Sequence, residues 1–242
     1  VKLTLYFDTV KIPCYGSPVC TLHRHWGVLG LPKNLSKSTY HHGDLRQVLL
    51  DEAAAILRSE GAPALSMRKL ADRVGVSRTA PYHHFEDKQA LLCAIGEEGF
   101  RRFHGFFHSL SLNQSLSRAD FENFVKNYVR FAVDNAEYYN LMFGSELWSR
   151  AKLTESLKHE AHQAFQFYVN MVRRWHADGL THAAIEPLRF AQVTWSTLHG
   201  MSRLLIDGIY VDQAAIDAIC TNAADFFWDS LQKPQADATE LA

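Results

Sequence analysis

From Asp44 to about residue 232, apolar side chains recur at the three- and four-residue spacing of an α-helix almost without interruption. The first such stretch, DLRQVLLDEAAAILRSEG, places these apolar side chains on one face: Leu45, Val48, Leu49, Ala53, Ile56 and Leu57. Strand-like alternation of any length is lacking over the same region, so the pattern predicts an all-α fold. The 242 residues allow one large domain or two smaller ones.

Capping residues divide the start of this region into short helices. Ser66 is expected to cap a helix that Gly75 ends, and Ser77 is expected to cap a second short helix directly after it. Glu86 or Asp87 is expected to cap a longer helix that follows. Two short helices joined by a tight turn that contains glycine make a helix-turn-helix, and with the helix before it this motif completes a three-helix bundle.

The residues of this motif are candidates for DNA contact. In a helix-turn-helix the second helix enters the major groove with its first residues at the base edges. Arg78 can pair with guanine and Thr79 can contact a thymine methyl group, whereas Tyr82 and His83 suit phosphate and sugar contacts. Between Ser66 and Phe85 there are four basic residues and one acidic residue, although the whole chain has a net charge of −1. The basic footprint is therefore local.

The candidate DNA contacts extend slightly beyond the motif. They are Lys37, Ser66, Arg68, Ser77, Arg78, Thr79, Ala80, Tyr82, His83 and Lys88. Lys37 belongs to the leader that precedes the first helix, which could act as an arm over a phosphate or in the minor groove. A leader that makes no contact with DNA is the alternative. Lys88 opens the third helix, where it can reach a phosphate beside the helix N-terminal amides.

The segment SMRKLADRVGVSRTAPYHHFEDKQALL closely resembles the DNA-binding domain of TetR-family transcriptional regulators, and the resemblance extends over about residues 40–102. The matching positions are Ser66, Arg68, Leu70, Ala71, Gly75, Val76, Ser77, Tyr82, Phe85, Asp87, Lys88 and Leu91. Pro81 departs from the pattern, which more usually has Leu or Ile, but in the first turn of a helix its missing N–H is expected to be tolerated. The resemblance implies a second, helical domain that binds a small molecule and dimerises.

The chain accordingly divides into four parts. Residues 1–39 are an N-terminal extension of doubtful structure, 40–102 the helix-turn-helix domain, 103–232 a larger helical effector-binding and dimerisation domain, and 233–242 a polar tail. Helices of the larger domain are predicted near 118–135, 137–148, 154–178, 184–208 and 212–232. Within it, Trp195, His199 and Gly200 resemble the Trp-His-Gly signature of one class of C-terminal domain in TetR-type regulators.

Aromatic and methionine side chains are dense in the larger domain, and most of them are expected to form its core. A subset is predicted to line a cavity for a small apolar or aromatic effector. These candidates are Phe103, Tyr128, Tyr138, Met142, Phe165, Trp195 and His199. His199 follows Trp195 by one helical turn and therefore shares its face, although a histidine among apolar residues is more often part of the core.

The last two predicted helices carry apolar stripes wider than one core requires. The positions are Ala191, Trp195, Leu198, Leu205 and Ile209 on the first and Ile216, Ile219, Ala223, Phe226, Phe227 and Leu231 on the second. The surplus predicts a homodimer through these helices, with burial inside one chain as the alternative. A dimer would place two recognition helices on a palindromic operator.

Other classes of protein find little support. A zinc site could be considered for two cysteines and two histidines near the start of the chain, Cys14, Cys20, His23 and His25. Their spacing is poor for zinc binding. Cys14, Cys20, Cys93 and Cys220 are too scattered for a disulfide framework and indicate reduced thiols in a cytoplasmic protein. Nucleotide-binding loops, nucleophile elbows and long apolar spans are lacking, so no cofactor, metal, enzymatic activity or membrane insertion is expected.

The resulting prediction is a ligand-responsive transcriptional regulator, a repressor that a small apolar effector releases from a palindromic double-stranded DNA operator. A helical small-molecule-binding protein, or an enzyme, without DNA binding is the alternative.

Overall fold

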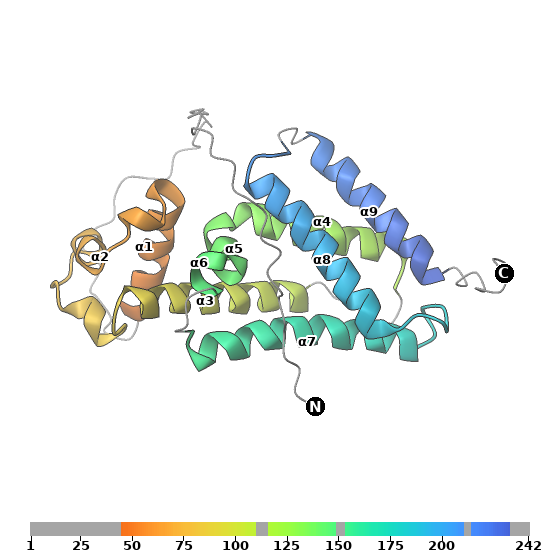
Figure 1. Ribbon diagram of the computed structural model, residues 1–242, viewed down its shortest axis with the longest axis horizontal. Helices are drawn as coiled ribbons and strands as arrows, with labels where there is room; N and C mark the ends of the chain where they lie inside the picture. Colours follow the sequence, from red (N-terminus) through yellow and green to blue (C-terminus); the bar gives the residue numbers. More distant parts are fainter. Residues whose placement is uncertain (1–44, 110–115, 149–152, 211–213, 233–242) are drawn as a thin grey trace. The chain divides into compact units, whose positions relative to one another are not determined.

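A computed structural model of the chain describes residues 45–109, 116–148, 153–210 and 214–232 (Figure 1). All regular elements in these ranges are helical, so the predicted all-α fold is confirmed. They are α1 (Leu45–Glu60), the 3₁₀ helix η1 (Ala62–Ala64), α2 (Met67–Val74), the 3₁₀ helix η2 (Ala80–His83), α3 (Lys88–Ser109), α4 (Arg118–Asp134), α5 (Ala136–Phe143), α6 (Ser145–Trp148), α7 (Glu155–Ala177), α8 (Pro187–Ile206) and α9 (Ala214–Gln232). The predicted N-terminal extension and C-terminal tail lie outside the described residues.

The predicted caps of α2 and α3 are confirmed. The side chain of Ser66 accepts a hydrogen bond of 3.2 Å from the backbone N–H of Lys69, which satisfies one of the free amides at the start of α2. Asp87 does the same for α3, since its carboxylate accepts from the N–H of Ala90 at 2.8 Å. Gly75 ends α2 with φ +78°, in the left-handed region that the turn requires.

The second helix of the predicted motif is shorter and tighter than expected. A regular helix starting after Ser77 would begin with a bond from the N–H of residue 81 to the Ser77 carbonyl, and Pro81 has no N–H. The Ser77 carbonyl instead accepts from Ala80 at 3.0 Å, and Tyr82 donates to Thr79 at 3.0 Å, so the segment forms the 3₁₀ helix η2. The predicted capping role of Ser77 is therefore wrong, because Thr79 occupies the N-cap position of η2.

The larger bundle is built around α3, which packs against α5 and α7 (Figure 1). α4 packs against α8 and α9. The predicted helices near 118–135, 154–178, 184–208 and 212–232 correspond to α4, α7, α8 and α9, whereas the helix predicted over 137–148 is divided into α5 and α6. The division lies at Gly144, whose backbone is extended and whose missing Cβ would lie only 2.1 Å from the carbonyl oxygen of Asn140.

The predicted boundary after residue 102 falls inside α3, which runs through it without a break. The described residues between Leu45 and Gln232 belong to one compact unit. The division into a DNA-binding part and an effector-binding part therefore stays a prediction, and α3 contributes to both parts. In the described ranges, none of the helices combines the length and the apolar character that crossing a membrane requires.

Two glycine substitutions are expected to change stability in opposite directions. An added Cβ would meet no atom within 4 Å at either Gly75 or Gly105, so only the backbone distinguishes the two sites. Gly75→Ala should destabilise the fold by about 1–2 kcal/mol because alanine disfavours the left-handed conformation. Gly105→Ala, on an exposed face of α3, should stabilise it by about 0.5–1 kcal/mol. Urea denaturation of both variants measures the difference, and a shift of the same sign in both would contradict this account.

Candidate functional site

The turn after α2 and the helix η2 present an exposed surface. Pro81 and Phe85 point into the core, Phe85 with only 4% of its surface exposed. Between these two anchors Tyr82 is 55% exposed, which is unusual for a large aromatic side chain, and His83 is exposed as well. The side chains of Ser77, Arg78 and Thr79 are also exposed, and Ala80 is half-buried. The structure thus places these sequence-predicted residues together on one short segment.

Two of the cations near this segment are paired with α1. Lys69 of α2 forms an ion pair with Glu60, and Arg73 Nε lies 2.6 Å from Glu52 Oε1. Both acids belong to α1, so these cations hold two helices of the bundle together. Arg78, in contrast, has no ion-pair partner among the residues that the structure describes, which leaves its guanidinium available to an external anion or base edge.

The remaining predicted DNA contacts differ in their surroundings. Ser66 and Arg68 are exposed at the start of α2, where Arg68 Nε is a distant 4.0 Å from Asp72 Oδ2. Lys88 is half-buried, and its Nζ donates a hydrogen bond of 2.8 Å to the carbonyl oxygen of Ala62 in η1. Lys88 therefore has a structural contact that the sequence did not indicate. Lys37 lies outside the described residues.

A small cavity lies between α3, α4, α7 and α8. Its lining residues are Phe103, His104, Phe107, Phe124, Tyr128, Ala164, Phe167, Tyr168, Met171 and Trp195. None of them is an aspartate, glutamate, lysine or arginine, so the cavity is almost entirely apolar and aromatic. The volume is about 10 Å³, which is close to the minimum that one water molecule needs. The aromatic rings thus fill nearly all of the space in this structure.

Three of the seven predicted cavity residues line this space: Phe103, Tyr128 and Trp195. The Trp195 ring packs edge-on against Phe103 and Tyr128, with ring centroids 5.6 and 5.8 Å apart. Phe165 packs against Trp195, with ring centroids 5.5 Å apart, but it does not line the cavity.

Tyr138, Met142 and His199 also lie elsewhere. Met142 packs at Gly99 of α3, and the guanidinium of Arg102 stacks on the Tyr138 ring at 4.6 Å. His199 packs on the ring of Tyr139, with ring centroids 5.6 Å apart. These three residues belong to α5 or pack against it, and they do not line the cavity.

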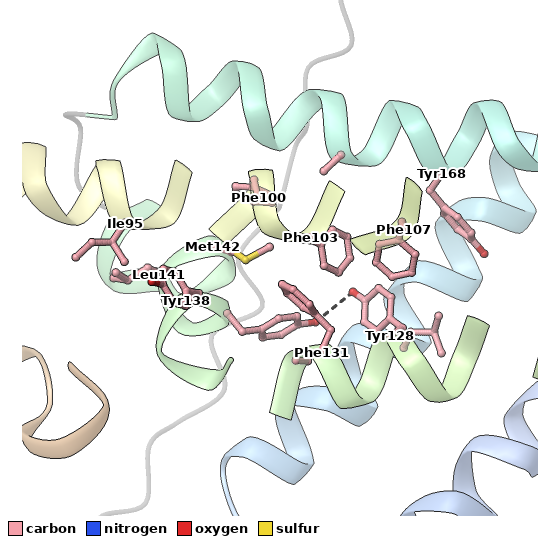
Figure 2. Packing of buried hydrophobic residues seen from close by; sticks show 14 of the residues in the cluster. Ile95, Phe100, Phe103, Phe107, Tyr128, Phe131, Tyr138, Leu141, Met142 and Tyr168 are labelled. Carbon is pink, nitrogen blue, oxygen red and sulfur yellow. Dashed lines mark hydrogen bonds between the residues drawn. The ribbon is translucent and has the colours of Figure 1, made fainter. Parts of the chain in front are cut away.

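Several cavity residues were missed at the sequence level. These are His104, Phe107, Phe124, Ala164, Phe167, Tyr168 and Met171. Helical spacing could have indicated two of them. Phe107 is one turn after Phe103 (Figure 2), and Phe124 is one turn before Tyr128 in the sequence. The residues of α7 could not be assigned in this way, because the face that α7 turns to the cavity depends on its packing against α3 and α8.

A chain of hydrogen bonds connects the cavity wall with α5 and α8. The Tyr128 hydroxyl lies 3.2 Å from that of Tyr139 (dashed in Figure 2), which in turn lies 2.9 Å from Nδ1 of His199. Burial raises the pKa of Tyr139 to about 12. Burial, together with the nearby charge of Arg203, lowers the pKa of His199 to about 4. All three groups are therefore neutral at physiological pH.

The other tyrosine hydroxyl at the cavity is also bonded. Tyr168 and Thr194 share a hydrogen bond of 2.6 Å, and burial raises the pKa of Tyr168. Both tyrosine hydroxyls of the lining thus already have partners, so an uncharged occupant is favoured over an ionic one.

Parts of the apolar stripes of α8 and α9 remain exposed. Phe226 is 70% exposed and Val193 59% exposed, and Ile209 lies exposed just beyond α8. In contrast, Leu198 and Leu231 are buried inside the chain. Val193 was not part of the predicted stripes. Among the predicted stripe residues, Phe226 and Ile209 are the exposed ones, and Ile209 lies beyond the end of α8. The surplus apolar surface is thus smaller than the sequence indicates.

In the described ranges, no group of three or more histidine, cysteine, aspartate or glutamate side chains is arranged to hold a metal ion. The zinc reading of Cys14, Cys20, His23 and His25 falls on residues that the structure does not describe.

Comparisons with known proteins identify two matching sequence families. Residues 49–95 match the family described as bacterial regulatory proteins, tetR family, and residues 121–227 match a tetracyclin repressor-like C-terminal domain. The tetracycline repressor protein class C of Escherichia coli is 40% identical over 52 residues, which are 22% of this chain and 24% of that repressor. The transcriptional repressor AcnR of Corynebacterium diphtheriae is 37% identical over 57 residues, 24% of this chain and 30% of AcnR. The match thus spans about a quarter of the length of these relatives.

Solved structures match over a longer range. A protein from Rhodococcus sp. RHA1, described as having unknown function, is 34% identical with a TM-score of 0.71, covering 81% of this chain and 100% of that one. The TetR family transcriptional regulator PfmR of Thermus thermophilus is 18% identical with a TM-score of 0.58, covering 76% and 99% of the two chains. The second likeness shows the same fold.

The low pKa of His199 predicts a pH-dependent stability. Its pKa of about 4 in the folded chain lies below the unfolded value of 6.5, so the unfolded state binds more protons between these two values. The stabilisation from neutral His199 is complete above pH 6.5 and is lost as the pH falls toward 4. Urea denaturation at pH 7 and pH 5 should show that wild type loses about 1–2 kcal/mol more than His199→Gln.

The matched control is His159→Gln, at an exposed position of α7. This variant should lose as much stability as the wild type between the two pH values. Equal losses in wild type and His199→Gln would show that His199 does not contribute to the pH dependence.

Proposed function

This chain belongs to the TetR family of bacterial regulatory proteins, and from this premise we propose that it is a DNA-binding transcriptional repressor whose operator binding responds to a small molecule. The observation that carries the proposal is the exposed segment from Ser77 to His83, held by the buried Pro81 and Phe85, in which the guanidinium of Arg78 has no ion-pair partner among the described residues. We assign it no enzymatic step and place it in the cytoplasm, where bacterial DNA lies.

The proposed DNA contacts follow from the position of each side chain. Arg78 pairs with a guanine through two hydrogen bonds, and the methyl group of Thr79 contacts a thymine. Tyr82 and His83 donate to phosphate oxygens beside the groove, as does the exposed Arg68 of α2. Because η2 is only one turn long, few side chains can reach base edges, and the sequence specificity of one protomer depends mainly on Arg78 and its immediate neighbours.

The remaining predicted contact residues have secondary roles in the proposed DNA binding. Ser66 and Ser77 are exposed hydroxyls that can donate to phosphates, and Ala80 allows close approach of the backbone. Lys88 can offer its remaining N–H donors to a phosphate, since a lysine has three and Ala62 uses one.

The proposed effector is an uncharged apolar or aromatic molecule. The cavity lining contains no aspartate, glutamate, lysine or arginine, and its tyrosine hydroxyls are already bonded. Since the cavity of about 10 Å³ has no room for such a molecule, binding must displace rings of the lining, with Trp195 and Phe103 among them. The effector can shift the chain between two forms only as far as it binds one of them more tightly than the other. If the form that binds the effector more tightly also binds the operator more weakly, the effector releases the repressor from DNA.

Two copies are proposed to associate through α8 and α9. The exposed Phe226 and Val193 would become buried in such a contact, which removes apolar surface from water. A two-fold dimer presents two copies of η2 to DNA, so the operator is expected to be palindromic with half-sites roughly 34–36 Å, or a multiple of this, apart.

Selection of duplexes from a random library tests the function without knowledge of the operator. The protein should enrich a palindrome, and its affinity for the selected duplex should fall linearly with salt on logarithmic axes. A chain that enriches no sequence and is indifferent to DNA at low salt would be a helical small-molecule-binding protein instead. Addition of neutral aromatic compounds to the bound complex then tests for release.

Replacement of the unpaired arginine should reduce specific binding. Arg78→Ala is expected to weaken binding to the selected operator by about 1–3 kcal/mol and to relax the preference at one base position in each half-site. Fluorescence anisotropy with operator and with scrambled duplex measures both effects. Arg173→Ala, at an exposed position of α7, is the control and should bind both duplexes as wild type does. If Arg78→Ala weakened binding to both duplexes equally, Arg78 would contact only phosphate.

A charge at the proposed dimer contact should separate the protomers. Phe226→Glu places a carboxylate where an apolar ring is 70% exposed, so the fold of one chain should be retained while the dimer is lost. Sedimentation equilibrium should give the mass of one chain, and operator affinity should fall because two half-sites are no longer bound together. Asn170→Glu, an equal charge on the exposed face of α7, should leave the dimer intact. A dimer that survived Phe226→Glu would place the contact elsewhere.

A further inference from the structure

The short helix α5 contacts α1 through a buried charge. Glu137, in the first turn of α5, has only 3% of its side chain exposed, and its carboxylate accepts a hydrogen bond from the guanidinium of Arg58 near the end of α1. Among the described residues Arg58 is the one cation that forms an ion pair with Glu137. Separation of the two would leave a buried carboxylate unpaired, which is strongly unfavourable. α1 and the start of α5 are therefore held together.

The next residue of α5 makes a second connection to α1. Tyr138 packs beneath the guanidinium of Arg102, a residue of α3, at 4.6 Å. The same guanidinium donates to Asp51 of α1, with Nη2 and Oδ1 2.7 Å apart. Two consecutive residues of α5 are thus linked to the helix that supports the helix-turn-helix, one of them directly and one through Arg102.

Tyr139, the next residue of α5, is connected to the cavity. The hydroxyl of Tyr139 is bonded to that of Tyr128, whose ring lines the cavity (Figure 2), and to His199 of α8. Successive residues of an α-helix point about 100° apart, so one turn of α5 can contact α1 on one side and the cavity wall on another.

Close packing makes α5 suited to move as one piece. At Gly99 of α3, an added Cβ would lie 2.8 Å from Sδ of Met142 and 3.2 Å from Cβ of Tyr138. The backbone of α3 and the side chains of α5 therefore leave no free space between them. In an interior of this density, a displacement at Tyr139 is passed to Glu137 and not absorbed by rearrangement in between.

We propose that α5 transmits the state of the cavity to α1, with the Glu137–Arg58 pair as the link. An occupant too large for the cavity displaces the ring of Tyr128, which pulls or releases Tyr139 and shifts α5. Because Glu137 keeps its single cationic partner, α1 follows, and the orientation of the helix-turn-helix changes with it. The inference rests on the proposed function in so far as the cavity is taken to hold an effector.

Hydrogen–deuterium exchange in the full-length protein tests the link without effector or DNA. Tyr139→Phe removes both hydrogen bonds of the hydroxyl and retains the ring. In an otherwise wild-type chain it should change the exchange rates of amides in Leu45–Glu60 by roughly two- to thirtyfold. When Glu137→Gln is also present, the change in α1 should become much smaller, because only the connection through Arg102 remains, while the change in peptides of α4 and α8 around Tyr128 and His199 should persist.

A matched control uses an ion pair of α1 that does not involve α5 or Arg102. Arg73→Gln breaks the pair between α2 and Glu52 but does not touch α5, so Tyr139→Phe should still change exchange in α1 in its presence. If Glu137→Gln alone unfolds the chain, the double variant Arg58→Gln/Glu137→Gln, which buries no unpaired charge, replaces it.

An α1 response of undiminished size in the Glu137→Gln background would overturn the inference, and so would Tyr139→Phe leaving α1 unchanged in every background. Neither result depends on DNA, so failure of the link and failure of operator selection are separate outcomes.

Discussion

The continuity of α3 is the constraint on which the rest of the structure depends. Its buried side chains extend from Leu91 to Phe107, and it packs against α1 as well as against α5 and α7 of the larger bundle. One helix of 22 residues thus contacts both α1 and the larger bundle. A helix of this length behaves as a stiff rod, so a change of packing against its second half alters the surroundings of its first half.

The two proposed sites differ in how they are held. The DNA-binding segment is fixed by local features, namely the left-handed Gly75, the buried Pro81 and the inward Phe85, which together force Tyr82 and its neighbours outward. The cavity is held by rings from four helices that fill one another's space, with Trp195 at the centre. A site of the first kind is preformed, whereas a site of the second kind can open only when several rings move together.

The two proposed sites also differ in their charged and titratable groups. The cations of α2 are mostly engaged in pairs with α1, so the positive charge that a residue count attributes to the motif is partly used for stability. Arg78, which has no ion-pair partner in the part of the chain that the structure describes, then accounts for much of the positive charge that the surface offers to DNA. At the cavity, burial keeps Tyr139 and His199 neutral, which suits an uncharged occupant. The hydrogen bonds among Tyr128, Tyr139 and His199 therefore respond to changes in geometry and not to changes in charge.

Most of the fold was predictable because it rests on short-range preferences. The helices of the larger bundle follow the apolar period, and the caps at Ser66 and Asp87 depend on residues three positions away. Where prediction failed near Ser77, the reason was again local: Pro81 removes the first helical hydrogen bond, and its effect on a one-turn helix was underestimated.

The candidate cavity was only partly predictable. Phe103, Tyr128 and Trp195 line it, but Tyr138, Met142 and His199 face other neighbours, and Phe167 and Tyr168 were not selected. The sequence by itself determined the all-helical architecture, the glycine turn and the outward surface after it, because each depends on residues adjacent along the chain. Only the tertiary structure decided which aromatic rings meet, which cations are paired and that Glu137 is buried against Arg58, because these depend on how helices far apart in sequence rotate against one another.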